Sequence, residues 1–401
     1  MNKKNKSDFI LVIVFAIIIF VPLIWLPIKY VLLATGRSTL TMTDNWEYYQ
    51  KTGNRYIDLV EGAKVGVTNR VNNYFPFYTD LTSMYHGMNF ELNNLLYDGD
   101  IVVGKNTDSE VIMFNTENKF YYLKSRYSKE ELNKRLDEQV SFYNRLSKID
   151  DVTLNIYMPL RYELMNLSDN NLNDYVIKFG NNLSDNINFG YLEIDTLYDY
   201  LEYYYKTDHH WNSLGALEGY LSIAEMMDLD IAIDFDSEIH SVSDIPYYGS
   251  MAKSLLSTRV ADEFTDNNIK NSCNVSVTGK DNNTYKPKEF KASANKFYDY
   301  YVNYFNGQYG EVILDCNNDD DKENLLIISD SVAWQIDYLV ASGFNKTYVV
   351  NMRYDEFANN TLDLNEYIKK NNITQILFLQ EAANIMFDEF NHDLKTRIEV
   401  R

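Results

Sequence analysis

A run of twenty apolar residues near the amino terminus constrains the topology of this chain more than any other sequence feature. It covers residues 9–28 (FILVIVFAIIIFVPLIWLPI) and contains no charged side chain. A helix of about 20 residues, each rising ~1.5 Å, spans the roughly 30 Å hydrocarbon core of a bilayer. Pro22 and Pro27 would kink its outer half, which membrane helices tolerate. We therefore expect one transmembrane signal-anchor helix within residues 9–35.

Positive charge before this run sets its expected orientation. Lys3, Lys4 and Lys6 precede it, and an excess of Lys and Arg holds a segment in the cytoplasm. Residues 1–8 are then a cytoplasmic tail. A cleaved signal peptide is the alternative, although signal peptides usually have an apolar region of about 7–15 residues that ends at a small-residue cleavage site. Both interpretations export the rest of the chain, so we expect a single-pass protein of the cell membrane with an extracytoplasmic C-terminal domain.

The composition excludes some partners and cofactors. The 401 residues include 37 Lys plus Arg and 58 Asp plus Glu, which gives a formal charge of −21. Such an acidic chain repels phosphate backbones, so we expect no nucleic-acid partner. Cys273 and Cys316 are the only cysteines, and their spacing fits no metal site. The sequence leaves open whether they form a disulfide, and we expect neither a metal nor another cofactor.

The exported part divides near residue 128. Residues 36–127 are expected to form a membrane-proximal region of short helices, with strands within 100–122. A helix is expected over residues 128–148. Ser128 and Glu131 have the spacing of a capping box, and apolar residues recur at helical intervals after them.

Short apolar runs alternate with helical stretches beyond this helix. The expected helices cover 333–342 and 364–370. The expected strands cover 152–158, 191–194, 325–328, 348–350 and 376–379. Buried strands separated by helices are typical of a parallel sheet covered on both faces. We therefore predict a three-layer α/β domain over residues 128–401, interrupted by a polar insertion near 236–322, with active groups where strands end and helices begin.

Two of the five histidines are adjacent, in the segment YKTDHHWNSLG that begins at Tyr205. Asp208 precedes His210 by two residues. On a loop, such an Asp can accept the Nδ1 proton of the imidazole, fix its tautomer and stabilise the imidazolium. A polar turn without chemistry is the alternative interpretation. His209 is assigned to packing or substrate contact, and Trp211 either forms an aromatic wall for a sugar ring or serves as a core residue.

A candidate nucleophile follows the apolar run at 325–328. This run leads directly into Ser329, Asp330 and Ser331 at the expected start of a helix. Ser331 Oγ would then lie above the edge of the sheet, where N–H groups at the helix start can stabilise an oxyanion. Simple capping of the helix by these three residues is the alternative.

The block YKTDHHWNSLGALEGY resembles the signature of DHHW-family proteins, which are relatives of the SGNH-hydrolase-like O-acetyltransferases that modify exported polysaccharides such as alginate. In those relatives an Asp-x-His motif precedes a Gly-Asp-Ser motif that follows a strand. Asp208, His210 and Ser331 occur in the same order here, although Ser329 replaces the usual glycine. The segment VVNMRY, which contains Arg353, resembles the strand ending in Arg-Tyr that follows the serine block. The resemblance implies an SGNH/flavodoxin-like parallel sheet.

The resemblance also implies a function. We expect a membrane-anchored serine O-acyltransferase, with acetyl as the expected group, that acts on a cell-envelope or exported polysaccharide through Ser331, His210 and Asp208. Arg353 is the candidate for an anionic substrate group. A multi-pass membrane-bound O-acyltransferase is the implied acyl donor. A carbohydrate esterase with the same triad and an inactive envelope scaffolding protein are the alternatives. A zinc deacetylase fits less well, because two adjacent histidines and one Asp make a poor zinc site.

Overall fold

The expected membrane helix and cytoplasmic tail lie outside the residues that the computed structural model describes. Those residues are 83–85, 87–88, 90–92, 99–105, 110–167, 172–230, 240–266, 273–278, 290, 293, 295–305, 307–316, 322–358, 360–389 and 393–400. Within these ranges, no helix has both the length and the apolar character needed to cross a bilayer. The chain forms two compact units, Met1–Asn89 and Phe90–Arg401. The described residues of the first unit, 83–85 and 87–88, are helical.

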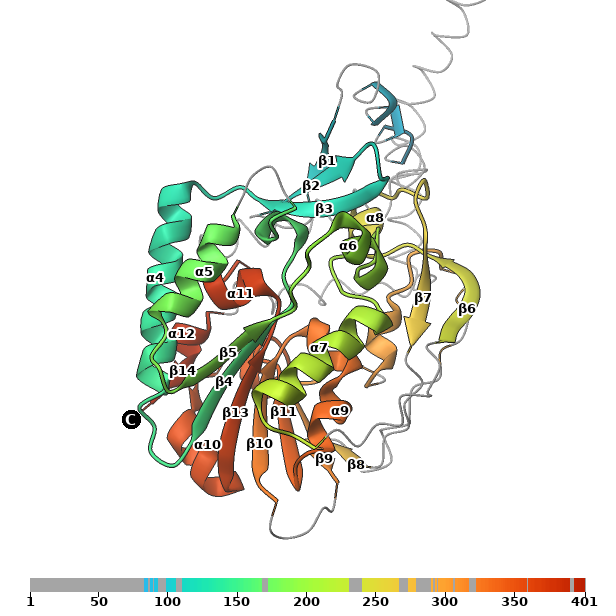
Figure 1. Cartoon of the computed structure of the whole chain (residues 1–401). Coiled ribbons are helices and arrows are strands. Elements are labelled where there is room, and N and C mark those ends of the chain that lie inside the picture. Colours follow the sequence, from blue (N-terminus) through green and yellow to red (C-terminus); the bar gives the residue numbers. More distant parts are fainter. Residues whose placement is uncertain are drawn as a thin grey trace, which may run out of the picture. The chain divides into compact units, whose positions relative to one another are not determined.

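A seven-stranded sheet forms the centre of the second unit (Figure 1), in the order β5-β4-β13-β10-β11-β9-β8. The first five strands are parallel, whereas β9 runs antiparallel to both β11 and β8. In sheet order, the strands are Ile187–Tyr191, Thr153–Met158, Ile373–Leu379, Asn324–Ser329, Lys346–Val350, Glu311–Asp315 and Asn274–Val277. The sheet is therefore mixed, which corrects the expectation of a purely parallel one. Both β9, which runs against the other strands, and its neighbour β8 come from the 236–322 insertion, whose polar sequence concealed them.

Four of the five expected strands are confirmed as β4, β10, β11 and β13. The fifth was placed wrongly, because β5 occupies Ile187–Tyr191 rather than 191–194. Its polar residues explain the error. Asn188 Nδ2 donates to Asn155 Oδ1 at 2.8 Å, and Asn155 Nδ2 donates to Gln375 Oε1 at 3.0 Å. These amides form a ladder across β5, β4 and β13, which a search for apolar runs does not detect.

Helices cover both faces of the sheet. The α4 helix (Lys129–Leu146) begins with the predicted capping box, in which Ser128 Oγ accepts from the Glu131 N–H at 3.2 Å. Its Tyr143 packs edge-on against Phe378 of β13, with ring centroids 5.0 Å apart. The α7 helix (Ser213–Met226) lies on the opposite face, where a Cβ at Gly190 would meet both Tyr157 of β4 and Met226. Tyr157 pairs with Leu379, the residue after Phe378. Because successive residues of a strand point to opposite faces of the sheet, Tyr157 and Phe378 lie on different faces.

The remaining elements flank this sheet or join its strands. The helices are η2 (Tyr162–Leu164), α5 (Asn173–Asn182), α6 (Leu197–Tyr203), α8 (Ser250–Ser254), η3 (Tyr300–Asn303), η4 (Ser331–Gln335), α9 (Asp337–Ala341), η5 (Asp355–Ala358), α10 (Leu364–Asn371), α11 (Ala382–Phe387) and α12 (Leu394–Arg397). The η4 and α9 pair and α10 correspond to the two helices expected after β10 and β11. Two short pairs are β6 (His240–Tyr247) with β7 (Asp262–Asp266) and β12 (Leu362–Asp363) with β14 (Ile398–Glu399).

An antiparallel three-stranded sheet precedes α4. It consists of β1 (Ile101–Lys105), β2 (Glu110–Asn115) and β3 (Phe120–Ser125). The sequence indicated strands in this region but not the central strand β2. Alternate residues of the sheet, such as Ile112 and Leu123, form a small core with Met251 and Leu255 at α8. This second core connects the three-stranded sheet to α8 by burial of apolar surface.

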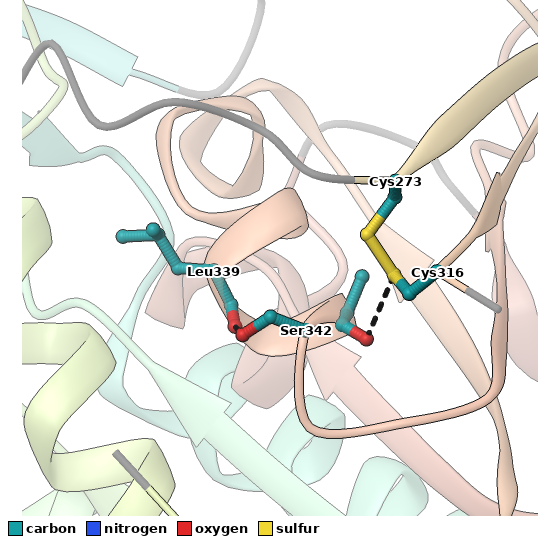
Figure 2. The surroundings of a disulfide bond; sticks show 5 residues. Cys273, Cys316, Leu339 and Ser342 are labelled. Carbon is teal, nitrogen blue, oxygen red and sulfur yellow. Dashed lines mark hydrogen bonds between the residues drawn. A yellow bond between two sulfur atoms is a disulfide. The ribbon is translucent and has the colours of Figure 1, made fainter. Parts of the chain in front are cut away.

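A disulfide joins Cys273 and Cys316 at one edge of the main sheet (Figure 2). The two cysteines flank β8 and β9, which pair from Asn274 to Val277. Cys316 Sγ also lies 3.2 Å from the Ala341 carbonyl oxygen at the end of α9. The disulfide thus joins the two ends of a segment with a sequence separation of 43, and this segment contains η3 and part of the candidate site.

Candidate active site

Asp208 and His210 lie on the loop between α6 and α7. The base of this loop is closed by a bridge between Tyr204 and Trp211. Asp262 of β7 fixes its other side, because its carboxylate accepts from the Lys206 and Thr207 N–H groups, both at 2.8 Å. Burial raises the pKa of Asp262 to about 6, although these hydrogen bonds oppose the rise. The insertion therefore supplies the residue that shapes the Asp-x-His loop.

Ser331 begins η4, directly beyond the carboxyl end of β10. Asp330 caps this turn by accepting from the Val332 N–H at 3.0 Å. Its second oxygen accepts from Asn384 Nδ2 at 2.7 Å and from the Glu381 N–H at 3.0 Å. Among the described residues, the Ser331 N–H has no hydrogen-bond acceptor and remains available to a substrate oxygen.

The structure brings Asp208, His210 and Ser331 into one hydrogen-bonded chain. His210 Nδ1 lies 2.5 Å from Asp208 Oδ1, and His210 Nε2 lies 2.8 Å from Ser331 Oγ. A carboxylate can only accept, so Nδ1 carries the proton and Nε2 accepts from the Ser331 hydroxyl. The nucleophile–base and base–carboxylate contacts of an acyl-transfer triad are both within hydrogen-bond range.

Four hydrogen bonds keep Asp208 ionised although the residue is only 2% exposed. Oδ1 accepts from the His210 ring and from the His210 N–H, while Oδ2 accepts from the Tyr247 hydroxyl at 2.9 Å and the Ser250 N–H at 2.5 Å. Burial by itself would raise the pKa of Asp208, but His210, His209 and these donors lower it well below the ordinary range. A charged carboxylate can orient the imidazole and stabilise its protonated form.

The two neighbours of His210 on this segment have different surroundings. His209 borders the pocket, and its Nδ1 lies 2.8 Å from Ser250 Oγ. Burial and the adjacent His210 lower the pKa of His209 to about 3, so it is neutral at physiological pH. Trp211 is fully buried and lies outside the pocket lining; its Nε1–H donates to the Val332 carbonyl oxygen at 2.9 Å. A direct contact between Trp211 and a sugar is therefore excluded, because the indole is packed in the core.

A pocket of about 280 Å³ opens onto the three residues. Its wall includes several aromatic side chains, together with Arg353 and Lys253. The Arg353 guanidinium lies 5.4 Å from the Tyr354 ring, and its Nε is buried without a hydrogen-bond partner among the described residues. A buried donor left unpaired in this way costs about 1–3 kcal/mol, which an oxygen of a bound substrate would recover.

Asp208, His209 and His210 also form a group of potential metal ligands, with their ligand atoms within 4.8 Å of one another. A metal ion bound through His210 Nδ1 would displace the proton shared with Asp208. The donor set therefore fits proton transfer better than metal binding, since zinc sites use deprotonated nitrogens free to face the ion.

Several site residues were missed by the sequence analysis. Tyr301 stacks on His210, Tyr247 donates to Asp208, and Glu381 borders the pocket directly after β13. Only Glu381 had a usable signal, because an acidic residue at the carboxyl end of a predicted strand belongs to the same edge of the sheet as Ser331. The two tyrosines come from the insertion and could not be distinguished from the other 32 in the sequence.

Comparisons with known proteins bear on the fold. The structure of a DHHW family protein from Eubacterium siraeum superposes with a TM-score of 0.52 and 18% identity, over 76% of this chain and 100% of that chain. The chain has the fold of a DHHW family protein. Bacillus cereus PatB1, in a structure with a sulfonyl adduct, gives a TM-score of 0.51 and 19% identity over 72% of this chain and 99% of that one. The α/β fold expected from the resemblance is thus confirmed, with the mixed sheet as its correction.

A looser likeness is found to the O-acetyltransferase domain of Pseudomonas putida AlgJ, with a TM-score of 0.35 and 11% identity over 72% of this chain and 99% of that domain. At that distance we draw nothing from it about this chain. No protein-family model and no curated protein matches the sequence.

Proposed function

We propose that this protein is an extracytoplasmic serine O-acyltransferase that transfers an acetyl group to a cell-envelope polysaccharide. The observation that carries the proposal is the unbroken hydrogen-bonded chain from Asp208 through His210 to Ser331. The apolar run at 9–28 would hold the domain at the outer face of the membrane.

The proposed reaction has two halves. Ser331 Oγ attacks the carbonyl carbon of the donor ester while His210 Nε2 takes its proton, and the imidazolium then protonates the departing alcohol. This leaves an acyl ester on Ser331. In the second half a sugar hydroxyl gives its proton to His210 and attacks the acyl carbon, after which the proton returns to Ser331 Oγ.

Two groups are proposed to bind the oxyanion or the substrate. The Ser331 N–H is the first, because it has no acceptor among the described residues. Arg353 is the second, because its buried Nε is unpaired at the pocket wall. We assign His209 to holding Ser250 and the loop rather than to proton transfer, since it is already neutral and hydrogen-bonded.

The sulfonyl adduct of PatB1 suggests a direct test. Sulfonyl fluorides trap an activated serine hydroxyl as a sulfonate ester with loss of fluoride. We expect phenylmethylsulfonyl fluoride to modify the full-length protein once, on the peptide that contains Ser331, and to leave the Ser331→Ala variant unmodified. Ser329→Ala is the matched control, because Ser329 Oγ is buried two residues away. Modification of Ser331→Ala at the wild-type rate would exclude Ser331 as the nucleophile.

A second assay separates transfer from hydrolysis. The protein in detergent is incubated with an acetyl ester and envelope oligosaccharides, and the products are analysed by mass spectrometry. Acetylated oligosaccharide that disappears with Ser331→Ala supports the transferase. Free acetate alone would support an esterase with the same residues. Intact substrates with the wild-type protein would favour a binding or scaffolding role. The donor in the cell, by the family resemblance, is proposed to be a multi-pass membrane-bound O-acyltransferase.

A further inference from the structure

One tyrosine from the insertion contacts both halves of the candidate site. Tyr301 is 1% exposed and stacks on the His210 imidazole, with ring centroids 3.9 Å apart and 20° between the planes. Its hydroxyl donates to the Trp211 carbonyl oxygen at 2.6 Å and lies 3.2 Å from Gln335 Oε1. The ring therefore covers the imidazole while the hydroxyl reaches two other segments.

These two segments carry the proposed base and nucleophile. Trp211 directly follows His210, and Gln335 ends the η4 turn that Ser331 begins. Apart from the contact between His210 and Ser331 themselves, the Trp211 indole on the Val332 carbonyl is a further link between the segments. Tyr301 thus connects the loop that carries His210 to the turn that carries Ser331, the two residues between which the proton is proposed to move.

Tyr301 is itself held firmly. Its N–H donates to Asp299 Oδ1 at 3.0 Å, and its ring packs edge-on against Phe264 and Tyr304, with centroids 5.8 and 5.7 Å away. The Cys273–Cys316 disulfide closes the interval that contains η3 (Figure 2). Because its ring and backbone are held by these packed neighbours, Tyr301 can restrict the imidazole rather than follow it.

We propose that Tyr301 is a positioning residue for acyl transfer, which aligns His210 Nε2 with Ser331 Oγ and stabilises the imidazolium formed when the proton moves. This inference rests on the proposed function. The aromatic face attracts a cation that lies over it, so stacking favours the protonated ring that arises in each half-reaction. The hydroxyl limits the separation of the two segments, and a misplacement of about 1 Å costs on the order of 100-fold in rate.

Three variants of the full-length protein in detergent test this role, with p-nitrophenyl acetate as the substrate. We expect Tyr301→Leu to lower kcat by about 10- to 100-fold, because both the stacking and the hydroxyl are lost. Tyr301→Phe should lower kcat by about 2- to 10-fold, as expected for one hydrogen bond. KM should stay within about twofold, because Tyr301 acts through His210. Tyr300→Phe is the matched control: it removes a hydroxyl from the same helical turn, outside the pocket lining.

A second readout does not depend on turnover. The chain has five histidines, so ¹³C-histidine labelling gives a spectrum simple enough to assign His210 by its loss in His210→Asn. We expect Tyr301→Leu to shift the His210 resonance as the ring current is removed, and Tyr300→Phe to leave it in place. If the wild-type protein has no esterase or transferase activity but this shift occurs, the proposed function fails while the contact stands.

Wild-type kcat and an unmoved His210 resonance in Tyr301→Leu would overturn the inference. Should Tyr301→Leu not fold, Tyr301→Phe decides, because it keeps the ring and the packing. A Tyr301→Phe protein with the same kcat as Tyr300→Phe would remove the hydroxyl from the proposal.

Discussion

Two buried acidic groups border the same pocket, and their pKa values are shifted in opposite directions. Asp208 has a lowered pKa because two imidazoles and four hydrogen bonds overcome the effect of its burial. Glu381 has a pKa raised to about 7 by burial, and by Glu389 and Asp330, against the opposing charge of Arg161. Burial is nearly the same for both, with 2% and 3% exposure, so the neighbours decide the direction of each pKa shift.

Glu381 belongs to a cluster in which a single guanidinium serves four carboxyl groups. Arg161 forms an ion pair with Glu110, and its Nη2 lies 2.8 Å from Glu389 and 3.8 Å from Glu163. Its Nε lies 4.0 Å from Glu381. Burial raises the pKa values of Glu110 and Glu163 as well. One cation cannot neutralise four anions in a medium of low dielectric, so some of these carboxyl groups stay protonated.

At this edge of the sheet, convergent donors and imidazoles lower the pKa of a buried carboxyl, whereas neighbouring carboxyl groups raise it. The direction of the shift thus separates Asp208, which is proposed to orient His210, from Glu381, whose cluster includes Glu110 of β2.

The largest effect is expected from Asp208→Asn. An amide cannot stabilise the imidazolium, and it favours the wrong tautomer of His210, so we expect kcat to fall by about 10⁴-fold with folding retained. Turnover of p-nitrophenyl acetate and thermal melting measure the two quantities. Asp195→Asn, on an exposed residue, is the control and should keep wild-type kcat. Activity of Asp208→Asn within tenfold of wild type would contradict the role of the charge.

Arg161→Met should give the next largest effect, on stability rather than on chemistry. Removal of the one cation leaves four buried carboxyl groups uncompensated, which we expect to lower the free energy of unfolding by about 3–5 kcal/mol. Urea unfolding followed by tryptophan fluorescence measures this loss. The exposed Arg126→Met is the matched control. Equal stability of Arg161→Met and wild type would mean that the cluster is neutral and needs no cation.

Glu381→Gln tests the raised pKa through the pH dependence of stability. Folding favours the protonated form of Glu381, so its contribution is complete below about pH 4 and is lost as pH rises through about 7. Other buried carboxyl groups with raised pKa values add to the slope of the wild-type protein and of the variant alike. Between pH 5 and 8 we expect the free energy of unfolding to fall less in the variant than in wild type, by on the order of 3 kcal/mol, which is the part of the slope that Glu381 contributes. The exposed Glu193→Gln should keep it. A variant with an unchanged slope would assign the titration to another group.

The smallest effect is expected from Tyr247→Phe. This change removes one of the four hydrogen bonds to Asp208, which is worth about 1 kcal/mol, or roughly a fivefold fall in kcat. Tyr220→Phe, in α7 and outside the pocket lining, is the control. A loss as large as that of Asp208→Asn would show that the Tyr247 hydroxyl, rather than the imidazoles, keeps the carboxylate charged.

The local sequence was sufficient for the elements that depend on neighbours along the chain. The capping box of Ser128 and Glu131 and the hydrogen bond between Asp208 and His210 each join residues a few positions apart, and the strand before Ser331 is a continuous apolar run. A strand interrupted by polar and small residues, such as β5 with its sequence INFGY, and the two strands inside the polar insertion were beyond this approach. Asn188 of β5 pairs with an amide of β4, and β9 pairs with β8 and β11, so these strands depend on residues of other strands tens of positions away.

The order of the motifs, the apolar run at 9–28 and the residue types of the candidate site could all be recognised from the sequence alone. The choice of the tyrosine that stacks on His210, the meeting of Cys273 with Cys316, and the opposite pKa shifts of Glu381 and Asp208 all required the folded structure. The physical reason is that stacking, disulfide geometry and pKa all depend on distances across space. Those distances are fixed by the packing of segments that lie far apart along the chain.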